Sequence, residues 1–166
     1  MKRILLVLAT LYLSGCTHYV PQHWEAHPTT ACKENVYVST CIEPKFMEYE
    51  DAFNHFILTI KNKTDKVIEL NWNKTNFISE GMSNGGFIFD GVMYKDKNMQ
   101  KQPDFIFANS AYSKSIYPAN LTQLGSTWSF NPMPAGENGI FITFVIDGKE
   151  VQEKITTKML TVLDPN

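Results

Sequence analysis

The segment Ile140-Phe141-Ile142-Thr143-Phe144-Val145-Ile146, close to the end of the chain, decides the fold. Seven almost wholly apolar residues in a row are typical of a β-strand that is buried on both faces. Asp147-Gly148 comes next, a pair that favours the type I′ turn of a two-residue hairpin. Residues 149–163 are rich in threonine and β-branched side chains and predict the returning strand. The sequence therefore predicts a long antiparallel hairpin over 140–163.

Two segments further upstream, 56–61 and 67–73, show the two-residue alternation of half-buried strands. The polar stretch Asn62-Lys63-Thr64-Asp65-Lys66 between them predicts a turn, because Asn and Asp side chains bond to the local backbone. We therefore expect an antiparallel pair with Trp72 on its core side. The Cys32–Cys41 stretch also contains a strand-like Val36-Tyr37-Val38.

The rest of the body is less regular, and its expected elements are short. Strands are expected at 76–79, 87–94 and 128–130, a flexible glycine-rich loop at 81–86, and at most one short helix at 48–55. Pro103 and Pro118 restrict any strand within 95–120 to a sheet edge.

Six to eight short strands in about 130 residues predict an all-β fold, an antiparallel β-sandwich. The strand, the Asn-Lys-Thr turn and the Trp-bearing strand in residues 56–79 resemble bacterial immunoglobulin-like domains. That resemblance implies an immunoglobulin-like sandwich. A small β-barrel is the alternative fold.

The first 15 residues have the features of a secretory signal peptide. Lys2 and Arg3 precede an apolar stretch that is too short to span a membrane, and small residues follow it. Leu13-Ser14-Gly15-Cys16 resembles the lipobox of bacterial lipoproteins. The resemblance implies cleavage before Cys16 and acylation of that residue, which would anchor the chain firmly in a membrane. The alternative is an ordinary secreted protein with a cysteine near its cleavage site.

Thr17 bears on which membrane holds the anchor. In Gram-negative lipoproteins an Asp at this position favours retention at the inner membrane, so by that resemblance Thr17 indicates the outer membrane. We expect the periplasmic face of the outer membrane rather than the cell surface. Removing the leader from 166 residues leaves 151, which suits one domain. The expected organisation is a signal peptide over 1–15, a lipidated flexible tether over 16–31 and a β-sandwich domain over 32–166.

Composition argues against nucleic acid as a partner. Without Lys2 and Arg3, 13 basic residues remain against 17 acidic ones, and no basic patch is evident.

Cys32 and Cys41 form an even pair in an oxidising compartment and predict a disulfide, with two free buried thiols as the alternative. A straight strand between them would hold the two Cα atoms too far apart, so the chain must fold back, with Lys33-Glu34-Asn35 as the expected turn.

No catalytic set is predicted, and we expect neither an enzyme nor a cofactor. Gly81-Met82-Ser83-Asn84-Gly85 matches the nucleophile-elbow pattern, but no histidine occurs after His55 to complete a triad, so we interpret the match as chance. The acids Glu48, Glu50 and Asp51 are interpreted as a solvated cluster rather than a glycosidase pair. His18, His23 and His27, with Glu25 nearby, lack the spacing of a known metal site, and no metal is expected.

Two further groups of residues have a structural and a functional interpretation. Asn62, Asn73 and Asn120 lie in N-x-T sequons, which we interpret as turn chemistry. The stretch 105–117 carries Phe105, Phe107, Tyr112 and Tyr117 among polar residues, typical of a contact surface. We favour the other interpretation, in which Phe105 and Phe107 belong to the core of an edge strand.

These features lead to one main hypothesis of function and two alternatives. The main hypothesis is a lipid-anchored, non-catalytic binding or assembly module for another envelope component, its partners being the membrane and an envelope protein or assembly. The first alternative is a surface-displayed lipoprotein that masks a receptor or mediates adhesion or exclusion. The second is a small cell-wall hydrolase built around Ser83 or the acids at 48–51.

Overall fold

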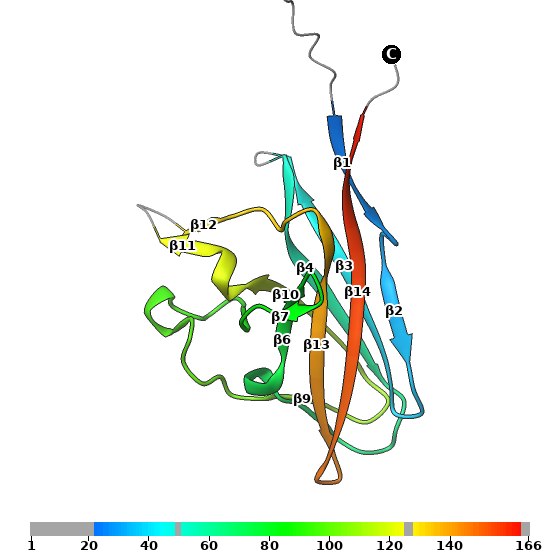
Figure 1. Cartoon of the computed structure of the whole chain (residues 1–166). Helices are drawn as coiled ribbons and strands as arrows, with labels where there is room; N and C mark the ends of the chain where they lie inside the picture. Colours follow the sequence, from blue (N-terminus) through cyan, green and yellow to red (C-terminus); the bar gives the residue numbers. More distant parts are fainter. Residues whose placement is uncertain (1–21, 49–50, 125–127, 164–166) are drawn as a thin grey trace, which may run out of the picture.

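The computed structural model describes residues 22–48, 51–124 and 128–163 (Figure 1). Its regular structure is almost entirely β-strand, and the described residues contain only three short 3₁₀ turns besides. Among these residues no helix has the length and apolar character that crossing a membrane would require. The signal peptide, Cys16, Thr17, His18 and the first part of the expected tether lie outside the described residues.

Two antiparallel sheets pack face to face, as the sequence predicts for a β-sandwich (Figure 1). The first sheet has the strand order β1 (Gln22–His27), β14 (Lys149–Leu163), β13 (Gly136–Ile146), β5 (Ile68–Leu70) and β9 (Asp104–Ile106). In the same sheet β6 (Asn76–Ser79) pairs with β13 and with β7 (Met82–Ser83).

The second sheet has the order β2 (Ala31–Glu34), β3 (Val38–Met47), β4 (Ala52–Asn62), β10 (Ala111–Pro118) and β8 (Phe87–Ile88). A separate small hairpin joins β11 (Thr122–Leu124) to β12 (Trp128–Phe130). The 3₁₀ turns are η1 (Trp72–Lys74), η2 (Tyr94–Asp96) and η3 (Ala119–Leu121). The all-β antiparallel sandwich expected from the sequence is therefore confirmed.

The β13–β14 hairpin has the turn that the sequence predicts. Asp147 and Gly148 adopt φ values of 50° and 75°, the two positive values that a type I′ turn requires. The core-facing side chains of β13, such as Ile142 and Phe144, are fully buried, whereas Phe141 and Val145 on the opposite face are half-buried. The apolar run therefore reflects one face in the core and a second face that is only partly covered.

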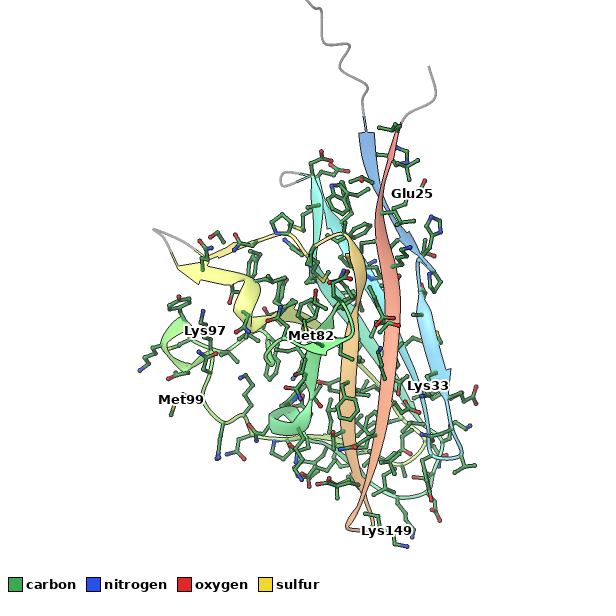
Figure 2. All side chains as sticks on the ribbon, viewed as in Figure 1. Glu25, Lys33, Met82, Lys97, Met99 and Lys149 are labelled. Atoms are coloured by element: carbon green, nitrogen blue, oxygen red, sulfur yellow. A yellow bond between two sulfur atoms is a disulfide. The ribbon has the colours of Figure 1, made fainter. Side chains whose placement is uncertain are left out.

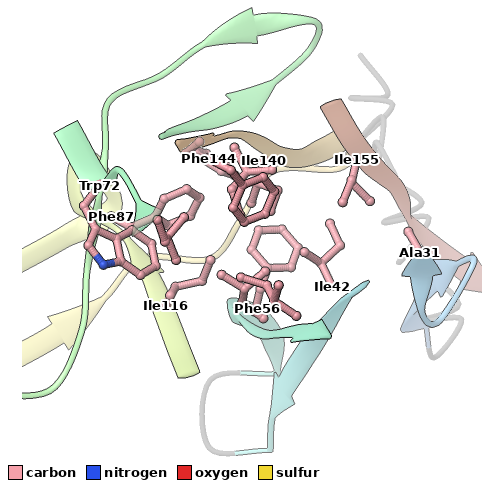
Figure 3. Close-up of a cluster of buried hydrophobic side chains, with 14 of the residues drawn as sticks. Ala31, Ile42, Phe56, Trp72, Phe87, Ile116, Ile140, Phe144 and Ile155 are labelled. Atoms are coloured by element: carbon pink, nitrogen blue, oxygen red, sulfur yellow. The ribbon is translucent and has the colours of Figure 1, made fainter. Parts of the chain in front are cut away.

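The hydrophobic core lies between the two sheets (Figure 3). Ile140 and Phe144 of β13 face Ile42, Phe56 and Ile116 of the second sheet, and all five are fully buried. Burying a side chain of this size stabilises the fold by about 1.5–3 kcal/mol. This core fixes both sheets as a rigid platform for the loops at their edges.

The segment 56–61 forms a strand as expected, but only residues 68–70 of the second segment do so, and the two strands do not pair with each other. β4 lies in the second sheet between β3 and β10, while β5 lies in the first sheet between β13 and β9. Both edges of β4 are already paired, so the turn after Asn62 carries the chain across to the other sheet. Trp72 is buried as predicted, although it lies on η1. The short helix considered at 48–55 is wrong, because residues from Ala52 onward pair with β3.

The flexible tether expected over 16–31 is also wrong for its second half. β1 pairs with the last residues of β14, from Gln22 opposite Leu163 to His27 opposite Lys158. After residues 28–30 the chain joins the other sheet as β2, which pairs with β3. The long β14 strand offers a free edge that gives order to a segment whose own sequence has little periodicity.

Cys32 lies directly opposite Cys41, and the two form the predicted disulfide with their Cα atoms 4.1 Å apart. The chain folds back as required, but the turn lies at residues 35–37 rather than at Lys33–Asn35. The Asn35 side-chain oxygen accepts the backbone N–H groups of Tyr37 at 2.6 Å and Val38 at 2.9 Å. This Asx-type turn places Val36 and Tyr37 outside the strand.

Candidate functional site

The longest connection without strand structure in the described part of the chain is residues 89–103, between β8 and β9. Long loops of this kind in compact domains usually carry function. Figure 2 shows the loop standing out from the sandwich, with Lys97 and Met99 labelled on it. Met93 and Met99 are each 63% exposed. The loop is therefore the first place to look for a binding site.

A cluster of aromatic rings around one ammonium group holds the base of this loop. Lys114 Nζ of β10 lies 4.1 Å from the ring centroid of Phe89, 5.4 Å from that of Trp72 and 5.6 Å from that of Tyr112. We call these four residues, together with Asp104, the lysine cage. Cation–π contacts of this kind contribute about 0.5–2 kcal/mol each, most where water is excluded.

Asp104 of β9 is the acceptor at the centre of the lysine cage. Its Oδ2 atom accepts hydrogen bonds from Trp72 Nε1 at 2.9 Å and from the Tyr112 hydroxyl at 2.5 Å, and it also binds the Lys114 ammonium. Because Asp104 lies on the first sheet and Lys114 on the second, the cage joins the two sheets at their open edge.

Burial and hydrogen bonding act in opposite directions on the Asp104 carboxylate. Burial raises the pKa of Asp104, but hydrogen bonds from Lys114, Tyr112 and Trp72 outweigh it and leave that pKa below its usual value. Burial first, and then the bond to Asp104, raise the pKa of Tyr112 well above its usual value. Asp104 is therefore charged and the Tyr112 hydroxyl protonated over the physiological pH range, as a stable ionic network requires.

The two phenylalanines that were expected in the core, Phe105 of the edge strand β9 and Phe107 just after it, are both exposed. Phe105 is 57% exposed and Phe107 is 68% exposed, while Ile106 between them is 2% exposed. The strand is an edge as predicted, but its buried face carries Ile106, so the alternate residues point outward. The contact-surface interpretation of this stretch therefore fits the structure, and the core interpretation is wrong. Tyr112 and Tyr117 are half-buried.

A second aromatic group lies on the outer side of the second sheet. The Tyr117 ring stacks on His55 at a centroid distance of 4.6 Å and contacts Phe130 at 4.5 Å. Burial, and then the charge of Lys45, lower the pKa of His55 below its usual value. Tyr117 and Phe130 form one wall of a concavity of about 350 Å³ whose other wall is the start of the 89–103 loop. The loop thus has a hollow beside it as well as exposed side chains on it.

The residues weighed for catalysis do not come together in the described structure. Ser83 is exposed on β7, opposite Ile78, and the chain continues to the strand β8. Glu48 is exposed and Asp51 lies in a turn with φ 47°, while Glu50 lies outside the described residues. These acids and Ser83 are on separate elements.

His23 and His27 lie on the exposed face of β1 on either side of Glu25. Their Nε2 atoms are 3.0 Å and 2.6 Å from the two carboxylate oxygens, and these bonds lower the pKa of Glu25. Among the described residues no group of three or more His, Cys, Asp or Glu side chains is arranged to hold a metal ion.

The three sequon asparagines have different structural roles. Asn62 is fully buried, and its amide joins three backbone carbonyls to the Thr64 turn, as the turn-chemistry interpretation predicts. Asn73 instead bonds to the backbone of Lys101, and exposed Asn120 donates to Asn84.

The lysine cage was not predicted from the sequence, since its members come from four separate segments. The only sequence signal was the aromatic stretch 105–117, which includes Tyr112 and Lys114 but neither Trp72 nor Phe89. Comparison with known proteins gives no further guide. The sequence matches no protein-family model, and no curated protein shows a significant match to it.

Proposed function

We propose that this chain is a lipid-anchored envelope lipoprotein that acts as a non-catalytic binding or assembly module. The observation that carries the proposal is the distribution of exposed apolar side chains. Of the ten large apolar side chains that are most exposed in the described residues, four lie within residues 93–107: Met93, Met99, Phe105 and Phe107. We call these four residues the contact strip.

The contact strip has the properties of a binding surface on a rigid support. Exposed phenylalanine and methionine are enriched at protein interfaces, and single exposed side chains would be expected to scatter. The lysine cage holds both ends of the 89–103 loop, because Phe89 begins the loop and Asp104 directly follows it. A fixed backbone lowers the entropy that a partner must remove on binding.

The partner we propose is an extended segment of another envelope protein that adds to β9. This strand ends the first sheet, so one side of its backbone faces no other strand of that sheet. Edge strands of this kind accept an additional strand, with the flanking side chains giving specificity. Phe105 and Phe107 would contact alternate side chains of the added strand.

Photo-cross-linking in cells tests the proposal. A photoreactive phenylalanine analogue at Phe105 or Phe107 should cross-link a discrete partner. The same analogue at Lys33, on the edge strand β2 of the opposite sheet, serves as the matched control. Phe105→Ser with Phe107→Ser should abolish the complex while the melting temperature changes little, because both side chains are exposed. Equal cross-linking from position 33, or an unchanged complex in the double variant, would contradict the proposal.

A further inference from the structure

A polar concavity of about 170 Å³ lies between the 89–103 loop and η1. Its lining side chains include Asn73, Asn76 and Asn98 together with Lys97 and Lys101. None of the described residues that line it is acidic. A hollow with this composition presents N–H donors and positive charge and has little apolar surface to offer.

Lys97 and Lys101 differ from the other lysines that the protein partly buries. Four lysines are half-buried in the described structure, and two of them, Lys45 and Lys114, pair with the carboxylates of Glu43 and Asp104. Lys97 instead donates to the Thr122 carbonyl at 3.2 Å and lies 4.7 Å from the ring centroid of Tyr94. Lys101 donates to the carbonyls of Lys97 at 2.9 Å and Met99 at 3.3 Å.

Within the described residues, the two ammonium groups therefore have neutral partners only. Burial lowers the pKa of Lys101, as expected when no anion compensates for lost hydration. Partly buried charges in proteins are usually paired. The two exceptions line the same concavity, so a single bound anion would compensate both.

The Asn73 side chain holds the 89–103 loop in place beside this concavity. Asn73 of η1 accepts the Lys101 backbone N–H at 2.8 Å and donates to the Lys101 carbonyl at 2.9 Å. This two-point bond fixes the loop backbone beside η1. Asn98 lines the same concavity and is exposed, so its amide can donate to a ligand there. The backbone that carries the two lysines is therefore already ordered before a ligand binds.

We propose that this concavity binds a phosphate group through Lys97, Lys101 and Asn98. The volume admits one compact oxyanion with some water, and a tetrahedral anion can accept from several donors at once. The phosphate would be free in solution or the end of a larger phosphate ester. Met99 of the contact strip also lines this concavity, but the proposed protein partner adds at β9, so phosphate binding does not depend on that partner.

A nearby acid, Asp96, repels the anion and provides a further test of the site. Asp96 lines the neighbouring concavity together with Lys101 and Asp104, and it forms no ion pair with either lysine in the described structure. Its negative charge lies on the same loop and repels an approaching phosphate, although water and salt partly screen this repulsion. Asp96→Asn is therefore expected to strengthen phosphate binding, while loss of either lysine weakens it.

Titration of the full chain with inorganic phosphate, in a maltoside detergent at constant ionic strength, tests the site. Amide ¹⁵N shifts should saturate and cluster at Asn73 and residues 97–101. Lys97→Gln and Lys101→Gln should each raise the Kd at least about fivefold, as expected for loss of a charge-assisted bond. Asp96→Asn should lower the Kd about twofold. Lys61→Gln, which removes an exposed lysine on β4 that does not line the concavity, should leave the Kd unchanged.

A second titration with dimethyl phosphate distinguishes the source of the phosphate. Binding of this diester as tight as that of inorganic phosphate would indicate a lipid headgroup or polymer, and a strong preference for the inorganic ion would indicate free phosphate or a monoester. Shifts that fail to saturate, that spread over all lysines, or that weaken equally in Lys61→Gln would overturn the proposal.

Discussion

The Lys114 ammonium binds the Asp104 carboxylate across the open edge of the sandwich, with Lys114 on β10 of one sheet and Asp104 on β9 of the other. The side chains are 25% and 30% exposed, so water screens the pair less than it screens a surface ion pair. Three aromatic rings cover the same ammonium group. The contact strip is thus supported by an ionic and aromatic connection that is built from both sheets.

Removing the charge of Lys114 should weaken this connection. Lys114→Met leaves Asp104 without its cation, and we expect a loss of about 2 kcal/mol in the free energy of unfolding. This loss corresponds to a melting temperature about 6 °C lower for a domain of this size. Lys114→Arg keeps the charge and should lose less than half as much. Lys154→Met, which breaks the exposed pair with Glu137, is the control and should cost under about 0.5 kcal/mol.

The cage should also give stability a pH dependence at both extremes. The pKa of Asp104 is lowered in the folded state, so its contribution is full above the unfolded value of about 3.9 and is lost as pH falls through the folded value. The pKa of Tyr112 is raised, so its contribution is present below about pH 10 and is lost above it.

Denaturant unfolding as a function of pH separates the two effects. Asp104→Asn should be less stable at pH 7 and lose less of its remaining stability below pH 4 than the wild type does. Tyr112→Phe should still lose stability at acid pH but should no longer show the loss of stability above about pH 10. Identical pH profiles for the wild type and both variants would show that the cage contributes nothing to stability.

Buried Asn62 shows how much of the fold the sequence reveals. Its place in a turn was predictable, because Asn suits turns. Its partners were not, since the side chain joins the β4–β5 turn to Ile106, the last residue of β9, and to Phe107, which follows it, and both are far along the chain. Local periodicity identifies strands and their buried faces but not the sheet that each strand joins. For the same reason the β13–β14 hairpin was predicted correctly, whereas the partners of β4 and β5 were not.

The candidate site was harder to predict than the fold. The sequence predicts that Phe105 and Phe107 belong either to the core or to a contact surface. Which of the two is correct depends on which face of the short strand β9 packs on the opposite sheet. The lysine cage required four separate segments to meet at a sheet edge. The strand β1 was missed because its order comes from pairing with β14 rather than from its own pattern.

Asn62→Ala should therefore destabilise the protein more than its place in a turn suggests. The amide donates at 2.7 Å to Lys66 O, 3.1 Å to Ile106 O and 3.0 Å to Phe107 O, and its oxygen accepts two bonds from Thr64. Leaving several buried groups without partners should cost about 3 kcal/mol. Asn120→Ala, at an exposed sequon, should change stability by under about 0.5 kcal/mol. Thermal unfolding of the two variants side by side makes the comparison, and equal losses would contradict it.

The disulfide should be worth about 2–3 kcal/mol, because it closes a short loop between two paired strands. Cys32→Ala with Cys41→Ala should unfold at lower denaturant concentration than the wild type. A reducing agent should bring the wild type to the level of the double variant and leave the variant itself unchanged. No difference between oxidised and reduced wild type would mean that strand pairing alone holds the loop.

The expected lipid anchor makes a prediction about where the body lies. β1 begins at Gln22, so only residues 17–21 separate the strand from Cys16, and the six Cα-to-Cα steps between Cys16 and Gln22 can span at most about 20 Å. The start of β1 lies opposite the end of β14, and the Asp147-Gly148 turn lies at the opposite end of the hairpin (Figure 1). A body anchored through Cys16 should therefore stay close to the membrane with that turn directed away from it.

Labelled palmitate should enter the wild type and not Cys16→Ser. Protease added to intact cells should leave the body whole until the outer membrane is permeabilised, with a periplasmic protein as the control. Digestion in intact cells, with the control intact, would instead place the contact strip outside the cell and favour receptor masking or adhesion.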